Sequence, residues 1–295
     1  MNQITRINPG SGRWWKVLQF PLIRFVIAAL ALLIVISVIQ IGAKALHIPP
    51  HSVLGVLVAL LLVVAVIVTY RIYVHLVERR PVIEFGFHGT GPELGRGFLV
   101  GMLLFSCTML ILWLCGVASI SSGSGWHALG YQLVGAILAG VMEETLVRGV
   151  LFRIIEESLG SWIALAISAA VFGALHAFNP GATVVSSIAI ALEAGVLLAA
   201  VFMYTRRLWM AIGLHAAWNF TEGGIFGANI SGTDAQGMWT STFTGPEYLT
   251  GGKFGPEASV VAILVCLAAG AVFLLLAKRR HHFVSPWWSR SKAGA

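Results

Sequence analysis

The sequence predicts an all-α polytopic membrane protein, a bundle of about eight transmembrane helices in a single integral-membrane domain over residues 1–295. The chain is 58% hydrophobic and only 11% charged, whereas soluble domains carry about 25% charged residues. Its apolar runs reach about 20 residues, enough for a helix to cross the hydrocarbon core. The runs are continuous in Leu, Val, Ile and Ala, whereas a β-barrel needs short segments of alternating hydrophobicity.

Eight segments have the apolar character of a membrane span. The first is too long for the core of a signal peptide, and no small-residue cleavage site follows it, so we expect it to remain as a span. The seventh is short and carries His215 and Asn219. The predicted spans cover residues 22–43, 53–76, 97–118, 128–152, 161–178, 183–204, 208–222 and 258–277.

Basic residues cluster on one side of this predicted topology, and the other side has only Lys44 and Lys253. Because Lys and Arg are retained on the cytoplasmic side of a membrane, both termini are expected in the cytoplasm. The net charge of +7 therefore reflects orientation and does not indicate nucleic-acid binding. The clusters comprise Arg6, Arg13, Lys16, Arg24, Arg71, Arg79, Arg80, Arg96, Arg153, Arg206, Arg207, Lys278, Arg279, Arg280, Arg290 and Lys292.

Three charged residues lie inside the fourth predicted span, in "VMEETLVRGVLF". Each would cost about 2.5–3.5 kcal/mol at the centre of a lipid-facing helix, so they must face the bundle interior or a wet cavity. Glu144 and Arg148 are four residues apart and can pair on one helix face. Glu143 points to another face, where its helical neighbours offer no hydrogen bond. Its partner must come from another helix, and its free carboxylate suits general acid–base catalysis.

The next predicted helix supplies a partner for Glu143. Glu143 lies 15 residues before Ser158, and His176 lies 15 residues after Ser161. If a turn at 158–161 joins two antiparallel helices, both residues lie about 22 Å from that turn and at the same depth. Phe172 precedes His176 by one helical turn and would form a wall beside the imidazole.

The seventh predicted span carries a third pair, His215 and Asn219, also on one helix face. A histidine and an amide in an apolar segment suit oxyanion donors or ligands. Each of these features also has a purely structural interpretation. His215 and Asn219 could form interhelical hydrogen bonds, the Glu144–Arg148 pair could be a structural clamp, and His176 could be a hydrogen-bonded packing residue. The combination of one base, two imidazoles and one amide on three spans favours a catalytic site. Glu193 has no evident partner and could face the same cavity or pair with Arg148.

These residues resemble the CPBP family of intramembrane proteases, also called the CAAX protease and bacteriocin-processing, or Abi, family. The family pattern is Glu-Glu-x-x-x-Arg, then Phe-x-x-x-His, then His-x-x-x-Asn. The chain reads "EETLVR" at 143–148, "FGALH" at 172–176 and "HAAWN" at 215–219, in the same order. The resemblance covers a catalytic core at residues 125–222, and the flanking sequences look bacterial.

The resemblance implies an eight-helix intramembrane endopeptidase in the bacterial inner membrane. Its expected partners are the membrane lipids that surround it and a membrane-associated protein or peptide that it cleaves. It implies that Glu143, assisted by His176, activates the attacking water. His215 and Asn219 would stabilise the oxyanion, while Glu144 and Arg148 would orient the helix and tune Glu143.

The family is classed with the metalloproteases, which raises the question of a metal. His176, His215 and Glu143 could bind a divalent metal such as zinc, although the sequence has no His-Glu-x-x-His helix. The same residues could equally run a metal-free glutamate mechanism.

Two alternatives to a protease remain from the sequence. A non-catalytic scaffold or bacteriocin-immunity protein would keep its phenotype after Glu143→Gln. A proton-coupled transporter is suggested by intramembrane carboxylates, but it predicts internal repeats that the sequence does not display. The long loop at 223–257 could be a lid or a flexible connection.

Overall fold

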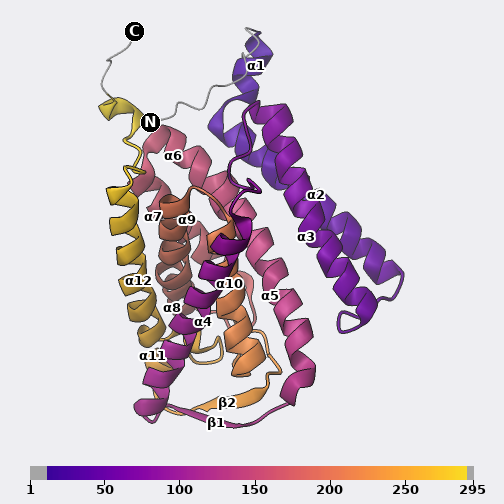
Figure 1. Cartoon of the computed structure of the whole chain (residues 1–295), viewed down its shortest axis with the longest axis vertical. Coiled ribbons are helices and arrows are strands. Elements are labelled where there is room, and N and C mark those ends of the chain that lie inside the picture. The colour runs from indigo at the N-terminus through magenta and orange to yellow at the C-terminus, as the bar shows by residue number, and fades with distance from the viewer. Residues whose placement is uncertain (1–11, 291–295) are drawn as a thin grey trace.

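The structure is a computed structural model that describes residues 12–290, and it is built almost entirely of helices (Figure 1). Arg6 and Lys292, which were counted above as orientation residues, lie outside the described part of the predicted 1–295 domain. The α-helices are α1 (Arg13–Leu18), α2 (Pro21–Ala45), α3 (Val53–Tyr73), α4 (Thr90–Leu114), α5 (Leu129–Glu144), α6 (Arg153–Leu159), α7 (Ser161–Leu175), α8 (Val184–Ile190), α9 (Val196–Thr205), α10 (Trp209–Asn219), α11 (Glu247–Thr250) and α12 (Val260–Arg279).

Several of these helices continue into short segments of different winding. The π-helical segments are η1 (Val74–Glu78), η3 (Thr145–Phe152), η5 (Ala191–Gly195) and η6 (Phe220–Ile225). The 3₁₀ segments are η2 (Gly125–Ala128), η4 (His176–Phe178), η7 (Pro256–Ala258) and η8 (Trp287–Ser289). π-helical segments are rare and concentrate at functional sites. Three of them carry a buried charged residue: Arg148 in η3, Glu193 in η5 and Glu222 in η6. These segments are therefore candidates for a functional site.

Six helices in the described part of the chain are long and apolar enough to cross a membrane, as a multi-pass membrane protein requires. They are Pro21–Ala45, Val53–Glu78, Thr90–Leu114, Ser161–Phe178, Val184–Thr205 and Val260–Arg279. All six correspond to predicted spans.

The expected number of eight spans is not confirmed. The two other expected spans, 128–152 and 208–222, are helical as α5–η3 and α10–η6, but they are not among the six. Both helices carry site residues, and these polar side chains lower their mean hydropathy. The α10–η6 helix is also too short to meet the length of a membrane span. Helix α10 lies inside the bundle: it packs against α4 and α5, and nearly all its residues are buried.

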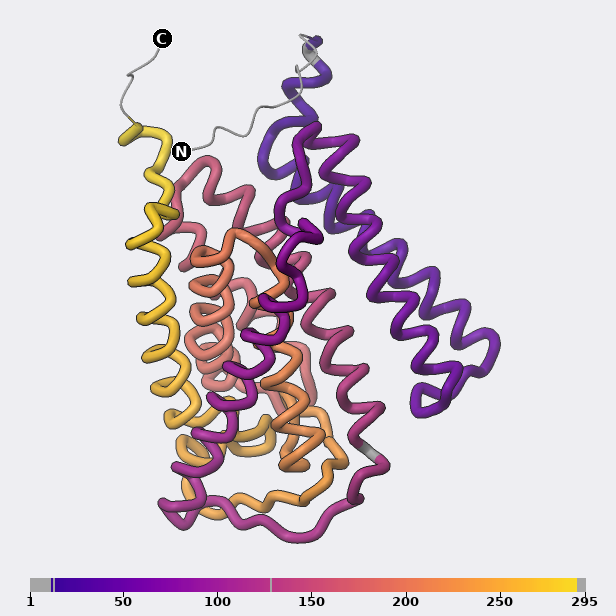
Figure 2. Tube along the Cα trace, viewed as in Figure 1, coloured from indigo at the N-terminus to yellow at the C-terminus, as the bar shows by residue number. Residues whose placement is uncertain are grey.

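The bundle has two distinct ends (Figure 1). At one end lie α1, α6 and η8. At the other, β1 (Ala118–Ser122) pairs antiparallel with β2 (Trp239–Phe243), and Ala118 lies opposite Phe243. The hairpin of α2 and α3 runs beside the bundle and diverges from it toward this second end (Figure 2). The loop at 223–257 lies at the second end and contains β2 and α11, so it is an ordered cap.

The first end is held by buried ion pairs. Glu78 at the end of η1 accepts hydrogen bonds from Arg24 at 2.6 Å and from Arg80 at 2.7 Å, and Arg153 also pairs with it. These three arginines are buried. They were counted above as orientation residues, but they also fasten α2, α6 and the segment after α3 together.

Candidate active site

The α6–α7 turn places Glu143 and His176 in contact distance. Helix α5 continues through η3 and α6 to Leu159, and α7 starts at Ser161. Gly160 between them has φ +81°, and a Cβ there would lie 2.8 Å from the Val284 carbonyl oxygen, so the turn requires glycine. The antiparallel helices bring Glu143 Oε2 to 3.9 Å from His176 Nε2, as their equal spacing from the turn predicts.

His215 reaches the same carboxylate from α10. Its Nε2 atom lies 3.9 Å from Glu143 Oε2. The two helices approach closely at Gly140, where an added Cβ would lie 3.1 Å from the Ile212 carbonyl oxygen. His215 therefore lies level with Glu143.

Glu144 occupies a different environment from its neighbour. Its side chain is fully buried, and its Oε1 atom accepts hydrogen bonds from Arg148 Nη1 at 2.9 Å and from His215 Nδ1 at 3.0 Å. Glu143, by contrast, keeps 35% of its side chain exposed, and its Oε2 atom has no hydrogen-bond partner. The predicted Glu144–Arg148 pair is present, and the contact between Glu144 and His215 is an addition that spacing within one helix could not predict.

Arg148 links three elements. Its Nη2 atom donates to the backbone carbonyls of Ala194 at 3.1 Å and Gly195 at 3.0 Å, at η5. Its guanidinium lies 4.4 Å from the centre of the Phe172 ring on α7, a favourable cation–π arrangement. The sequence left open a pair between Arg148 and Glu193, but Arg148 binds the backbone of η5 instead.

Hydrogen bonds fix the proton positions on both imidazoles. His176 Nδ1 lies 2.8 Å from the Phe172 carbonyl oxygen, which can only accept a hydrogen bond, so Nδ1 carries a proton. The Glu144 carboxylate fixes a proton on His215 Nδ1 in the same way. Each Nε2 atom is therefore the one that faces Glu143. The Phe172 and His176 rings lie 4.7 Å apart, so Phe172 forms the predicted wall.

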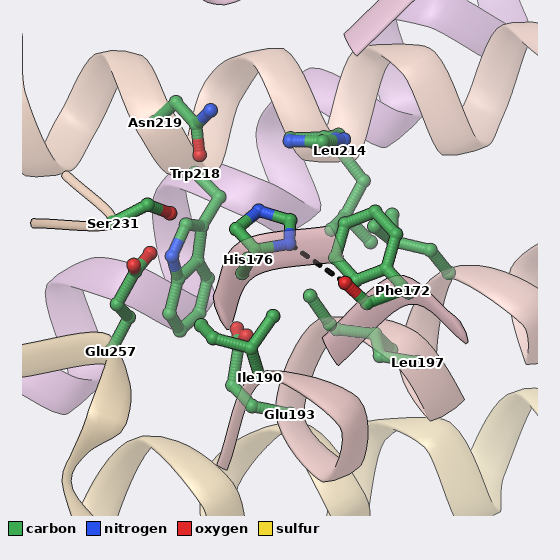
Figure 3. A pocket seen from close by; sticks show the side chains of 13 residues that line it. Phe172, His176, Ile190, Glu193, Leu197, Leu214, Trp218, Asn219, Ser231 and Glu257 are labelled. Atoms are coloured by element: carbon green, nitrogen blue, oxygen red, sulfur yellow. Dashed lines mark hydrogen bonds between the residues drawn. The ribbon is translucent and has the colours of Figure 1, made fainter. Parts of the chain in front are cut away.

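Asn219 lies one helical turn beyond His215 and lines a pocket together with His176 and His215 (Figure 3). The structure thus brings all the predicted residues together: Glu143, Glu144, Arg148, Phe172, His176, His215 and Asn219.

The same pocket contains polar residues that the sequence did not assign to the site. They are Glu193 from η5, Trp218 from α10, Ser231 from the 223–257 loop and Glu257 from η7. Asn179 anchors this loop, because its side-chain Nδ2 donates to the Ser231 carbonyl oxygen at 3.0 Å. Glu193 was noticed as an intramembrane charge. Ser231 and Glu257 had no signal, since no periodic pattern connects a long loop with a helix of the core.

The candidate metal ligands His176, His215 and Glu143 were tested against the geometry of a metal site. No group of three or more His, Cys, Asp or Glu within residues 12–290 is arranged to hold a metal ion. Tetrahedral zinc ligands at 2.0–2.1 Å from the metal lie roughly 3.3 Å from one another, whereas Glu143 Oε2 lies 3.9 Å from each Nε2. The residues as placed therefore do not fit a zinc site.

Comparison with known proteins gives one match, to a family model. Residues 125–221 match the model described as type II CAAX prenyl endopeptidase Rce1-like. Neither the curated proteins nor the solved structures gave a match to the chain. The matched segment begins just before α5 and ends within η6, so it contains all three motifs. Residues 125–221 are therefore similar to the Rce1-like type II CAAX prenyl endopeptidase family, which is consistent with the CPBP family that the motifs resemble.

Proposed function

We propose that this protein is an intramembrane endopeptidase that hydrolyses peptide bonds of a membrane-associated protein or peptide with a water activated by Glu143. The match to a CAAX protease domain supports peptidase activity. One observation carries the mechanism: Glu143 Oε2 is unpartnered and lies 3.9 Å from the Nε2 atoms of both histidines.

This separation suits a shared water. It is too long for a direct hydrogen bond, and a water molecule between such atoms can bond to several of them. With a proton fixed on its Nδ1 atom, neutral His176 presents an Nε2 lone pair. A water therefore donates one hydrogen to Glu143 and the other to an imidazole, which directs its oxygen lone pairs toward a substrate carbonyl.

The reaction balances on these residues. Glu143 takes a proton from the water as the water oxygen bonds to the carbonyl carbon of the scissile peptide. The tetrahedral oxyanion then forms near His215 and Asn219. When the C–N bond breaks, the proton held by Glu143 passes to the leaving nitrogen, which departs as an amine.

Two groups suit the oxyanion. The Asn219 amide can donate hydrogen bonds to it without any change of charge. His215 can donate only when Nε2 is also protonated, and the Glu144 carboxylate on its Nδ1 stabilises that imidazolium. Glu144 and Arg148 are then positioning residues, which act through His215 and through the α5–η3 helix.

A groove beside Glu143 offers a route for the substrate. It has a volume of about 170 Å³ and is lined by Glu143, Leu146, Val147, Phe172, Leu175, His176 and Asn179. Leu175 is about half exposed on the surface of α7. The groove therefore joins an apolar surface to the carboxylate, as cleavage of a membrane-embedded or membrane-bound chain requires.

The test compares the protein termini in membranes of cells that express the wild type, Glu143→Gln or Glu247→Gln. Glu247 is exposed on α11 and serves as the matched control. New termini should appear with the wild type and the control and disappear with Glu143→Gln at equal expression. If membranes with the wild type contain no termini beyond those of cells without the protein, the peptidase is rejected and a scaffold or immunity role is favoured. Termini that persist in Glu143→Gln would reject only the role of Glu143.

A further inference from the structure

A second, smaller pocket adjoins His176 and His215. Its volume is about 20 Å³, and Glu143 does not line it. A cavity of this size holds one group as large as a water molecule. Figure 3 shows His176 and Asn219 on one side of the pocket, with Glu193 and Glu257 on the other.

Each of the two acidic side chains that line this pocket has one oxygen without a hydrogen-bond partner. Glu193 and Glu257 are only 2% and 3% exposed, yet Glu193 Oε2 and Glu257 Oε1 are unpartnered. The other Glu193 oxygen accepts a weak hydrogen bond from the thiol of Cys266 at 3.4 Å. Glu222, which does not line the pocket, is fully buried and shares a hydrogen bond with Glu257. Within residues 12–290, none of these three carboxyls forms a salt bridge with a lysine, arginine or histidine.

The balance of donors and acceptors identifies the missing group. Two unpartnered carboxyl oxygens belong to the pocket lining, Glu193 Oε2 and Glu257 Oε1, against one unpartnered donor there, Trp218 Nε1. Buried carboxylates are stabilised when they are paired and hydrogen-bonded. A ligand that completes the pocket must therefore bring several hydrogen-bond donors and a positive charge.

Size separates the two cationic side chains. The ammonium group of lysine is compact, carries three donors and is close to a water molecule in size. The guanidinium of arginine is a wider plane with five donors, which exceeds a cavity of about 20 Å³. Ile190, Leu197 and Leu198 form apolar walls of the pocket, which suit the methylene group next to the ammonium.

We propose that this pocket is a substrate subsite in which Glu193 and Glu257 bind the ammonium group of a lysine close to the scissile bond. The proposal rests on the proposed peptidase function and narrows its substrates to membrane-associated chains with a lysine at one fixed position. Glu193 and Glu257 are then specificity-determining residues contributed by η5 and η7.

The test uses the full-length protein in detergent and a peptide that spans one cleavage site found in the membrane comparison. Each of the three residues on either side of the scissile bond is replaced in turn by lysine, arginine or norleucine, and kcat/KM is measured. At one position, the kcat/KM of the lysine peptide should exceed that of the norleucine peptide by at least about tenfold. This is the effect expected for one hydrogen bond to a charged group. Arginine should fall below lysine at that position.

Variants assign the selectivity to the pocket. Glu193→Gln and Glu257→Gln should each reduce the lysine-to-norleucine ratio, and the double variant should bring it near one. The control Glu247→Gln should retain the wild-type ratio. Because the ratio is measured within one preparation, partial loss of folded protein does not affect it.

The two proposals fail in different ways. If the wild type cleaves the peptides with no lysine preference at any position, or if the preference survives in the double variant, the subsite is rejected and the peptidase stands. A pocket occupied only by water gives the first of these results. If the wild type cleaves no peptide and produces no new termini in membranes, the peptidase itself is rejected.

Discussion

Glu144 accepts a hydrogen bond from His215 Nδ1 at 3.0 Å while its neighbour Glu143 faces His215 Nε2 at 3.9 Å. Two adjacent glutamates therefore contact the two nitrogens of one imidazole. The buried carboxylate fixes the tautomer and can stabilise the imidazolium. The half-exposed carboxylate remains free to take a proton from water.

Replacing Glu144 should mainly destabilise the protein. Glu144→Gln leaves Arg148 fully buried without its counter-charge, which costs about 3–5 kcal/mol in comparable buried pairs. The measurement is thermal or denaturant unfolding in detergent. The double variant Glu144→Gln/Arg148→Gln removes both charges, so it should be less destabilised than the sum of the single variants. Additive losses would mean that the pair contributes no coupling.

Replacing Glu143 should abolish catalysis and leave the fold intact. Glu143→Gln keeps the shape of the side chain but removes its basicity, and no ion pair at hydrogen-bonding distance is broken. The melting temperature should stay near that of the wild type, and peptide turnover should fall at least about a hundredfold, the low end for losing a general base. An active Glu143→Gln beside a folded but inactive Glu144→Gln would reverse the two assignments.

The contact between Glu143 and His176 could be predicted from the sequence, because it depends on local geometry. Fixed rise per residue and one short turn determine the relative depth of the two residues, and the structure places them together. The Glu144–Arg148 pair followed from helical spacing in the same way.

The rest of the site depends on contacts that no local rule describes. The hydrogen bond between Glu144 and His215 arises from the packing of α10 on α5. Ser231 and Glu257 reach the pocket because Asn179 anchors a long loop, and a loop without periodicity gives no register from which to predict this. The predicted number of spans is unconfirmed for a related reason: the two helices that carry most of the site are the ones whose polar residues weaken the apolar signal.

Metal removal tests the mechanism directly. Because Glu143 and the two imidazoles lie farther apart than zinc ligands do, we expect EDTA treatment followed by gel filtration to leave peptide cleavage unchanged. Metal analysis of the active preparation should find less than one zinc per chain. Loss of cleavage that added zinc restores would show that the three residues move together around a metal, and would reject the metal-free mechanism.

The pH dependence of stability tests the environment of Glu257, which lies in η7 before the last span. Burial raises the pKa of this carboxyl, an effect that the Ser231 hydrogen bond and nearby His176 partly oppose. The fold therefore favours the protonated form. Its stabilising contribution is complete below the unfolded pKa of about 4.3 and is lost as the pH rises through the raised pKa.

Glu257→Gln mimics the protonated carboxyl at every pH. The variant should therefore melt at the same temperature as the wild type near pH 4 and at a higher temperature than the wild type near pH 8. Unfolding in detergent at several pH values measures this, with the exposed Glu247→Gln as control. A variant that is less stable than the wild type at pH 8 would mean that the Glu257 carboxylate is stabilised by a partner in the fold.

The orientation of the bundle is the last prediction. Of the basic residues used to assign it, Arg24, Arg80 and Arg153 are buried in ion pairs and contribute less to the bias. Exposed Lys16, Arg79, Lys278, Arg279 and Arg280 still lie at the first end of the bundle, so we expect that end in the cytoplasm. In a variant without its native cysteines, Tyr248→Cys should react with a membrane-impermeant maleimide in intact cells, because Tyr248 is 65% exposed near the second end. Ser289→Cys, in η8, should react only after the membrane is permeabilised. The opposite labelling pattern would invert the topology and place the 223–257 loop in the cytoplasm.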